Sequence, residues 1–149
     1  MERVKRLSNG TKLLLLSGPL LFINLSFTWQ KLEIDFGRAG RADHLLDGWD
    51  AWGLLIGFLT LAVITLAVVV HLTDVELPPD VPWGILTFVL SGVVLGLTIV
   101  KNLLDAGSTL PSYVGIALAA SMVVGAYLER EAPASLESHA SANDLGEFG

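Results

Sequence analysis

The sequence predicts an all-α membrane protein, a bundle of four transmembrane helices with a structured first loop outside the cytoplasm. The first observation is that Lys, Arg, Asp and Glu are absent from four long stretches, residues 13–30, 51–73, 81–100 and 106–128. The second is length, because a helix over residues 51–73 extends about 34 Å and the hydrocarbon core of a bilayer is roughly 30 Å thick. The third is composition, with 52% hydrophobic and 16% charged residues, whereas soluble domains have roughly 25% charged residues.

Chain length and charge limit the classes of function. The 149 residues suffice for one domain, so we expect residues 1–131 to form the bundle, with no separate soluble catalytic domain. The expected spans are about residues 13–29, 51–70, 83–100 and 112–128. A net charge of −6 with nine basic residues argues against a nucleic-acid partner, which needs clustered Lys and Arg. Cysteine is absent, which excludes disulfides, thiolate metal sites and cysteine nucleophiles.

The first span, about residues 13–29, follows a short basic segment. A basic start before an apolar run is also typical of a signal peptide, but no Ala-x-Ala-like cleavage site lies near its end, so we expect the span to be retained. Pro19 lies in its first turns, where neighbouring helices usually accommodate a proline. Asn24 lies near mid-span, and its amide is expected to bond another helix.

The loop between the first two spans has internal order. Charged and apolar residues alternate from Lys31 to Phe36, which predicts a half-buried strand. Such a strand needs a partner that the chain does not obviously supply. A second copy or another subunit could provide it, and an irregular extended loop is the alternative.

The rest of this loop predicts a turn and a short surface helix. Residues 37–41 predict the turn, in which two arginines are either solvated or part of an anion-binding loop for a lipid phosphate. Residues 43–49 predict the helix, because Leu45, Leu46 and Trp49 share one face at helical spacing.

Small residues at helical spacing follow the later spans. Gly53 and Gly57 lie four residues apart, as do Gly92 and Gly96. Such pairs let another helix backbone come close, which matters because lipid gives helices no hydrophobic reason to associate. We therefore expect a tight bundle and no wide polar pore. The expected packing positions are Asn24, Gly53, Gly57, Gly92, Gly96, Gly115, Ala119, Ser121 and Gly125.

The second loop and the C-terminal segment predict hydrated surface. Asp74, Glu76 and Asp80 lie in a proline-rich loop, where a divalent-cation site would lack fixed geometry. His44, His71 and His139 lie in a loop, at a span end and in the C-terminal segment, so they do not form a pair on facing helices and we expect no metal and no cofactor. Residues 132–149 predict a flexible acidic tail, because their composition cannot bury enough apolar surface to fold.

Basic residues predict that both termini of this multi-pass protein lie in the cytoplasm. The terminal side narrowly has more basic residues, and the densest cluster precedes the first span. The basic residues of the terminal side are Arg3, Lys5, Arg6, Lys12 and Arg130, against Lys31, Arg38, Arg41 and Lys101 on the other side. Aromatic residues near the span ends predict interfacial anchors. These are Trp29, Trp49, Trp52 and Tyr113 on the outer side, and Trp83 and Tyr127 on the inner side.

Residues 20–29, Leu-Leu-Phe-Ile-Asn-Leu-Ser-Phe-Thr-Trp, close the first span, and after a charged loop residues 48–53, Gly-Trp-Asp-Ala-Trp-Gly, open the second. This combination, over about residues 13–60, resembles uncharacterised four-span integral membrane proteins of actinobacteria, which often have Pro where this chain has Thr28. The resemblance implies the topology and a bacterial cell membrane, and it brings no activity with it. A long first loop flanked by tryptophans is also similar to the claudin-type layout, but the loop cysteines of that family are missing.

Ionisable residues within a span usually mark chemistry, because burying them is expensive. The four spans contain none, so we expect a non-enzymatic scaffold or accessory subunit of a membrane complex, in contact with lipid and with copies of itself or another membrane protein. The alternative is an oligomeric small transporter or channel, with Asn24, Ser91 and Thr98 facing a shared cavity. An enzyme acting on lipid would have only Asp50, His71 and Lys101, and a lone histidine at a span end is expected to meet water.

Overall fold

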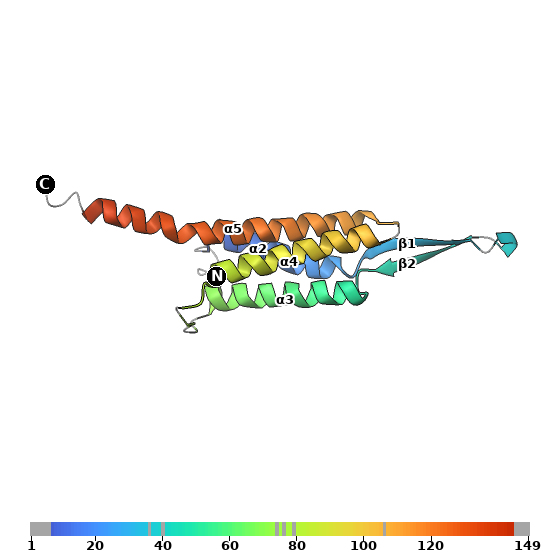
Figure 1. Cartoon of the computed structure of the whole chain (residues 1–149), viewed down its shortest axis with the longest axis horizontal. Coiled ribbons are helices and arrows are strands. Elements are labelled where there is room, and N and C mark those ends of the chain that lie inside the picture. The colour runs from blue at the N-terminus through green and yellow to red at the C-terminus, as the bar shows by residue number, and fades with distance from the viewer. Residues whose placement is uncertain are drawn as a thin grey trace.

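Four helices and one β-hairpin make up the computed structural model of the protein (Figure 1), which describes residues 7–35, 37–39, 41–73, 75, 77–78, 80–105 and 107–144. The elements in chain order are α2 (Asn9–Asn24), β1 (Thr28–Asp35), the 3-10 helix η1 (Gly37–Ala39), β2 (Arg41–Asp47), α3 (Ala51–Leu72), α4 (Trp83–Leu104) and α5 (Leu110–Asp144).

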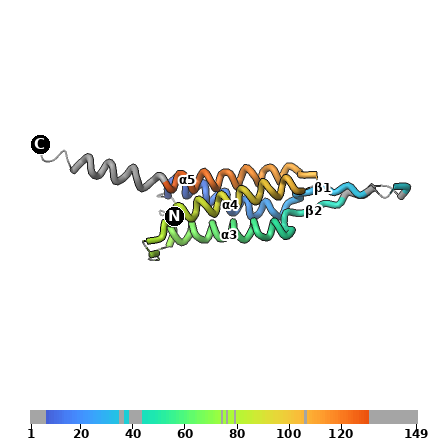
Figure 2. The backbone as a smooth tube through the Cα atoms, viewed as in Figure 1, coloured from blue at the N-terminus to red at the C-terminus, as the bar shows by residue number. Residues whose placement is uncertain are grey.

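The helices pack side by side in a four-membered ring (Figures 1 and 2). Both α2 and α4 pack against α3 and against α5. The start of α2 lies beside Gly125 and Glu129 of α5 at one end of the bundle, which we call the terminal end. The β-hairpin and the turn between α4 and α5 meet at the opposite end, the hairpin end.

Three of the helical segments are long and apolar enough to cross a membrane. They are Ala51–Leu72, Trp83–Leu104 and Leu110–Arg130, with mean hydropathies of 2.7, 2.2 and 1.5. Large apolar side chains cover their outer faces, and Phe58, for example, is 71% exposed. A surface of this kind requires lipid around it, so the chain is a multi-pass membrane protein.

The first helix differs from its predicted extent of about residues 13–29. It begins earlier, at Asn9, because the Oγ atom of Ser8 caps it by accepting a hydrogen bond from the backbone N–H of Thr11 at 3.0 Å. It ends earlier than predicted, at Asn24, whose free carbonyl accepts a hydrogen bond from the indole N–H of Trp29 at 2.9 Å. Trp29 itself lies in strand β1. With 16 residues, α2 is about 24 Å long and shorter than the other three.

Close helix contacts and a few large side chains form the core. A Cβ atom on Gly10 would lie 2.6 Å from the carbonyl oxygen of Gly125, so the backbones of α2 and α5 touch there. Toward the hairpin end, Leu21, Leu25 and Trp29 are fully buried. The close helix packing that the sequence predicts is therefore present between α2 and α5, where glycines leave room for the two backbones to touch.

The hairpin corrects the predicted first loop. The strand predicted at residues 31–36 is present as β1, but residues 43–49 do not form a helix, because β2 pairs antiparallel with β1 and supplies the partner strand. Leu45 and Leu46, neighbours in β2, therefore lie on opposite faces of the sheet. Gly37 has φ +62°, a left-handed conformation that glycine adopts without strain and that starts the turn.

Some predicted features fall on residues that the structure does not describe. Asp74 and Glu76 of the acidic loop lie outside the described residues, as do Phe36, Gly40 and residues 145–149. Helix α5 continues past the fourth predicted span to Asp144. The flexibility of residues 132–149 stays a prediction.

Candidate functional sites at the two ends of the bundle

The hairpin is joined firmly to the hairpin end of the bundle. Along its outer edge, β1 exchanges hydrogen bonds with the turn between α4 and α5, from Lys31 N–H to the Gly107 carbonyl and from Thr109 N–H to the Trp29 carbonyl, both at 3.1 Å. Across the base, Gly48 N–H donates to the carbonyl of Leu25 at 2.8 Å. These bonds fix the direction of the hairpin relative to the helices.

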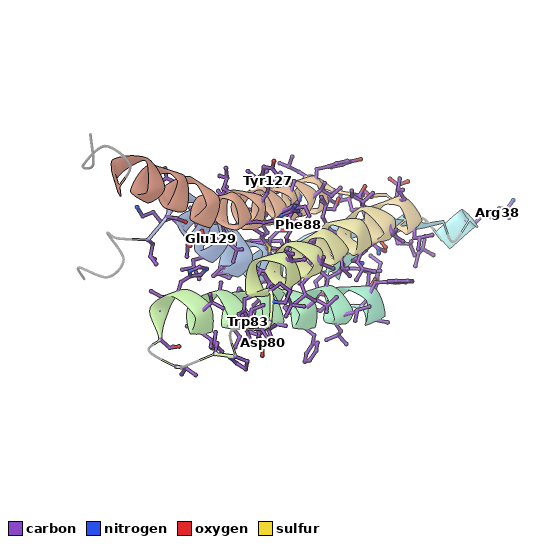
Figure 3. The ribbon with its side chains drawn as sticks, turned by 60° about the vertical axis from the view of Figure 1, so that its left-hand side comes forward. Arg38, Asp80, Trp83, Phe88, Tyr127 and Glu129 are labelled. Atoms are coloured by element: carbon purple, nitrogen blue, oxygen red, sulfur yellow. The ribbon has the colours of Figure 1, made fainter. Side chains whose placement is uncertain are left out.

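Beyond this base the hairpin projects away from the helices, and Arg38 lies at its far tip (Figures 1 and 3). The strand register places Leu32 opposite His44 and Gln30 opposite Leu46, and opposed residues share a face of the sheet. Leu32, Ile34 and Leu46 thus lie on one face together with Gln30 and His44, and we call it the apolar face. Each of its three apolar side chains is 37% or 38% exposed. On the opposite face, Lys31, Glu33 and Leu45 are exposed.

A buried lysine lies beneath the hairpin. The side chain of Lys101 is fully buried and its Nζ atom donates to Oδ2 of Asp50 at 2.6 Å. The same Nζ lies 3.0 Å from Oδ2 of Asp105, an ion pair without hydrogen-bond geometry, and 5.7 Å from the ring centre of Trp29. Asp50 also caps α3, because its Oδ1 accepts the N–H of Gly53 at 2.8 Å. This arrangement ties α3, α4 and β1 together.

The polar residues expected to line a transport path are inside the helix packing. Asn24 is 7% exposed, and Ser91 and Thr98 are fully buried. The hydroxyl of Thr98 donates to the Val94 carbonyl of its own helix at 2.7 Å, a common local bond. None of the three lines the cavity at the terminal end described below or the outer groove beside Phe58 and Leu61.

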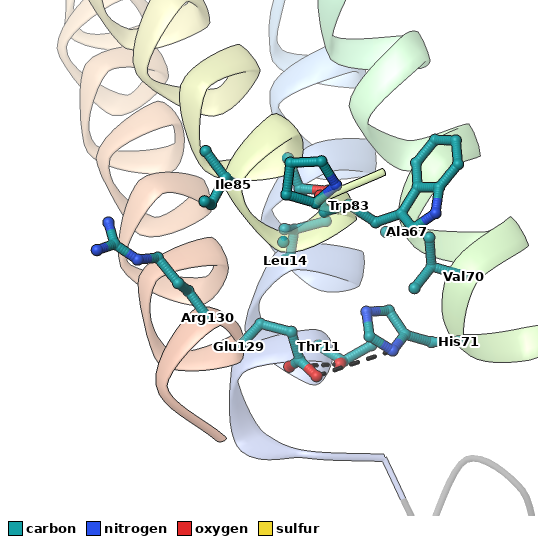
Figure 4. Close-up of a pocket in the computed structure, with 12 residues that line it drawn as sticks. Thr11, Leu14, Ala67, Val70, His71, Trp83, Ile85, Glu129 and Arg130 are labelled. Carbon is teal, nitrogen blue, oxygen red and sulfur yellow. Dashed lines mark hydrogen bonds and ion pairs between the residues drawn. The ribbon is translucent and has the colours of Figure 1, made fainter. Parts of the chain in front are cut away.

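At the terminal end, a carboxylate of α5 meets side chains of α2 and α3. Oε2 of Glu129 accepts hydrogen bonds from the hydroxyls of Ser8 and Thr11, the latter at 2.7 Å. Its other oxygen, Oε1, lies 3.8 Å from Nδ1 of His71. Figure 4 shows the Thr11, His71 and Glu129 side chains pointing toward one another. Sequence reasoning placed His71 in water and missed Glu129, which lies just beyond the charge-free stretch.

A cavity of about 420 Å³ adjoins this cluster (Figure 4), and we call it the terminal-end cavity. All four helices contribute to its wall. The lining comprises Thr11, Leu14, Ala67, Val70, His71, Pro82, Trp83, Gly84, Ile85, Thr87, Glu129 and Arg130. Its size and mostly apolar wall with a few polar groups are typical of small-molecule sites.

Some of the predicted packing positions lie in close helix contacts, and others do not. An added Cβ atom would lie 2.6 Å from the ring of Trp49 at Gly57, 2.6 Å from the ring of Trp29 at Gly115, and 2.9 Å from the Gly10 carbonyl at Gly125. Gly53 likewise touches the backbone of Gly48, and Ala119 is fully buried. Gly92 and Gly96, in contrast, have no described atom within 4 Å of an added Cβ.

The predicted interfacial anchors also divide. Trp29 is fully buried between Gly115 and Lys101, so its prediction as a membrane-surface anchor is wrong. Trp52, Tyr113 and Tyr127 are exposed. The other two are half-buried and bonded locally, Trp49 to the hydroxyl of Ser26 and Trp83 to the carbonyl of Pro78.

The candidates for lipid chemistry do not form one site. Asp50 and Lys101 are in contact at the hairpin end, and His71 lies near the other end of α3. A helix of 22 residues separates its ends by about 33 Å, so these groups cannot act on one substrate atom. Among the described residues, no group of three His, Asp or Glu side chains is placed to hold a metal ion.

Comparison with known proteins identifies no relative: no family model, no curated protein and no solved structure matches the chain.

Proposed function

We propose that this protein is a small, non-enzymatic accessory subunit of a membrane complex, in which the helix bundle serves as an anchor and the hairpin binds another membrane protein. The observation that carries the proposal is the firmly based hairpin with an exposed apolar face, Leu32, Ile34 and Leu46. An isolated two-stranded hairpin is marginally stable in water. A partner that covers this face would remove apolar surface from water.

The outer edge of β2 offers a second means of attachment. The sheet has two strands, and the outer edge of β1 is bonded to the α4–α5 turn at its base. No backbone bond from a described residue reaches the outer edge of β2. An added strand would bind there through main-chain hydrogen bonds, with side-chain pockets giving specificity.

A different protein suits this edge better than a second copy. The strands run along the length of the bundle (Figure 1), so two copies in one bilayer would be related by rotation about the strand direction. That rotation sets each backbone N–H opposite the same N–H of the other copy, and the two β2 edges could not bond.

The proposal includes four spans in a bacterial cell membrane, with the hairpin outside and the termini in the cytoplasm. Helix α2 counts as the fourth span because Gly10 and Asn24 face Gly125 and Gly115, so α2 extends along most of the span in α5. The side follows from the narrow excess of basic residues near the termini, and the bacterial membrane from the resemblance over residues 13–60. The buried positions of Asn24, Ser91 and Thr98 support an accessory role over transport.

Site-specific photo-crosslinking in the membranes of the native cell tests this function. A photoreactive amino acid at Ile34, which is 37% exposed on the apolar face of the hairpin, is expected to attach to one defined membrane protein. The matched control is the same group at Phe58, 71% exposed on α3, where we expect lipid adducts. A Leu32→Asp/Leu46→Asp variant should lose the protein adduct while its bundle unfolds as before. Adducts to a second copy, or to lipid alone, at Ile34 would refute the proposed partner.

A further inference from the structure

The terminal-end cavity has a polar end and an apolar end. Thr11, His71 and Glu129 form the polar end, and Leu14 and Ala67 lie about one helical turn deeper in the bundle. His71 is the last residue but one of α3, and Glu129 is close to the end of the membrane-length segment of α5. The polar end therefore lies at the level where lipid headgroups meet water, and the apolar end faces the hydrocarbon level.

This change in polarity is that of a membrane lipid. An amphiphile entering the cavity would place its polar group beside Glu129 and its chain against Leu14, Ala67 and Ile85. The cavity of about 420 Å³ falls within the roughly 300–1,000 Å³ of small-molecule sites. It contacts all four helices, so a bound chain would add apolar contact among them at this end.

The polar end is arranged to receive a hydroxyl group. Glu129 is held in place because Oε2 accepts from Ser8 and Thr11. The separation of 3.8 Å between Glu129 Oε1 and His71 Nδ1 is too long for a direct hydrogen bond. A hydroxyl between these atoms could donate to the carboxylate and accept from the imidazole N–H.

Charge and hydrogen bonding together favour an uncharged polar group. A carboxylate or phosphate would lie against Glu129, while the Arg130 guanidinium points away from Glu129 (Figure 4) and lies 5.8 Å from the ring centre of Phe88. An ammonium group has no lone pair to accept from an N–H at His71 Nδ1, the tautomer expected beside the Glu129 carboxylate. We propose that the terminal-end cavity binds an uncharged single-chain amphiphile with a hydroxyl-bearing head, oriented as the surrounding lipids are. This inference is independent of the proposed accessory function.

Three probes with the same chain and different heads test the head chemistry. Each carries an 18-carbon chain with a photoreactive diazirine, ended by glycerol ester, by free carboxylic acid or by primary amine. The full chain is reconstituted in phosphatidylcholine nanodiscs, illuminated with each probe, and the adducts are located by mass spectrometry. We expect the glycerol ester to label α2, α3 and α4 residues of the cavity, Leu14, Ala67 and Ile85, and unlabelled monoacylglycerol to compete.

Matched variants separate the cavity from general lipid contact. Ala67→Leu fills the terminal-end cavity, and Ala62→Leu changes the same helix at the outer apolar groove that Phe58, Leu61 and Val69 also line. Labelling of the cavity should fall at least fivefold in the first variant and stay unchanged in the second. His71→Phe, which adds no volume deep in the cavity, should weaken labelling about two- to tenfold through loss of one hydrogen bond.

Three outcomes would overturn the proposal. One is equal labelling by all three heads, another is preference for the acid or the amine, and the third is cavity labelling that His71→Phe leaves unchanged. If Ala67→Leu does not fold, the head series and His71→Phe still decide, because neither alters the buried core.

Discussion

Single residues at the hairpin end show how a membrane bundle accommodates charge. Lys101 has no solvent exposure, yet two carboxylates and one aromatic ring surround its ammonium group. An unpaired charge in this position would be strongly destabilising. The carboxylate of Asp50 has two roles, because one oxygen caps α3 and the other binds Lys101.

Replacing Lys101 with Met is expected to lower the free energy of unfolding by about 3 kcal/mol. The reason is that Asp105, 7% exposed, would stay buried without a counter-charge, whereas Asp50, 41% exposed, can be hydrated. The double variant Lys101→Met/Asp105→Leu should recover most of the loss, because apolar groups can replace a buried ion pair. Reversible unfolding by SDS from mild-detergent micelles measures both. A single variant as stable as the parent would contradict this account.

Residue type alone could not have predicted this cluster or the terminal-end cavity. Lys101 and Asp50 lie at span edges, as expected from the sequence. Their contact with each other, however, depends on α3 and α4 being neighbours in the ring of helices. Glu129 follows a charge-free stretch and resembles an ordinary span boundary. Its contact with Thr11 arises because the first turn of α2 packs beside the end of the membrane-length segment of α5. Pairings between distant helix ends leave no local pattern in the chain.

At the scale of elements, helix contacts depend on where glycines face. Gly10 and Gly125 allow α2 and α5 to touch through their backbones, whereas Gly92 of α4 faces open space among the described residues. The spacing of four residues was the same signal for Gly92 and Gly96 as for Gly53 and Gly57. Spacing therefore predicts a groove on a helix, and the arrangement of the other helices decides whether the groove is filled.

Replacing Gly125 with Ala is expected to reduce the free energy of unfolding by about 1–3 kcal/mol through overpacking. The new Cβ atom would lie 2.9 Å from the carbonyl oxygen of Gly10 and 3.0 Å from the amide of Leu14, and neither backbone atom can move away cheaply. Gly92→Ala is the matched control and should be neutral or slightly stabilising. The same SDS unfolding compares them, and equal effects of the two changes would show that the α2–α5 contact is not tight.

The elements themselves were largely predictable, and their limits were not. Charge-free stretches locate the three long helices because lipid excludes charge. The alternation at residues 31–36 located β1, but seven residues at 43–49 fitted a helix as well as a strand, and pairing with β1 decided the outcome. Trp29 was placed in the first span for its apolar neighbours, although its indole N–H ends the helix by bonding the Asn24 carbonyl.

For the molecule as a whole, antiparallel neighbours place the described loops on two opposite sides. The hairpin, with Arg38 at its tip, and the connection between α3 and α4, which includes Asp80, lie at opposite ends of the bundle in Figure 1. With apolar side chains around the helices, the plane of the bilayer crosses the bundle between these two positions.

Labelling of single cysteines with a membrane-impermeant maleimide tests this topology. The chain has no cysteine, so Arg38→Cys and Asp80→Cys each give one unique thiol. Both positions are exposed, so neither change should disturb packing. We expect Arg38→Cys to react in intact cells, and Asp80→Cys only after the membrane is permeabilised. The reverse result would invert the orientation, and reaction of both in intact cells would contradict a membrane crossing between them.

The bridge between Gln30 and Ser108 and the bonds near the hairpin base join the hairpin both to the turn between α4 and α5 and to α2. One strand is fastened to the turn between α4 and α5, and the end of the other, through Gly48, to the last turn of α2. A sideways load on the tip would thus shift these helix ends against each other and change the cross-section of the bundle on that side of the lipid layer.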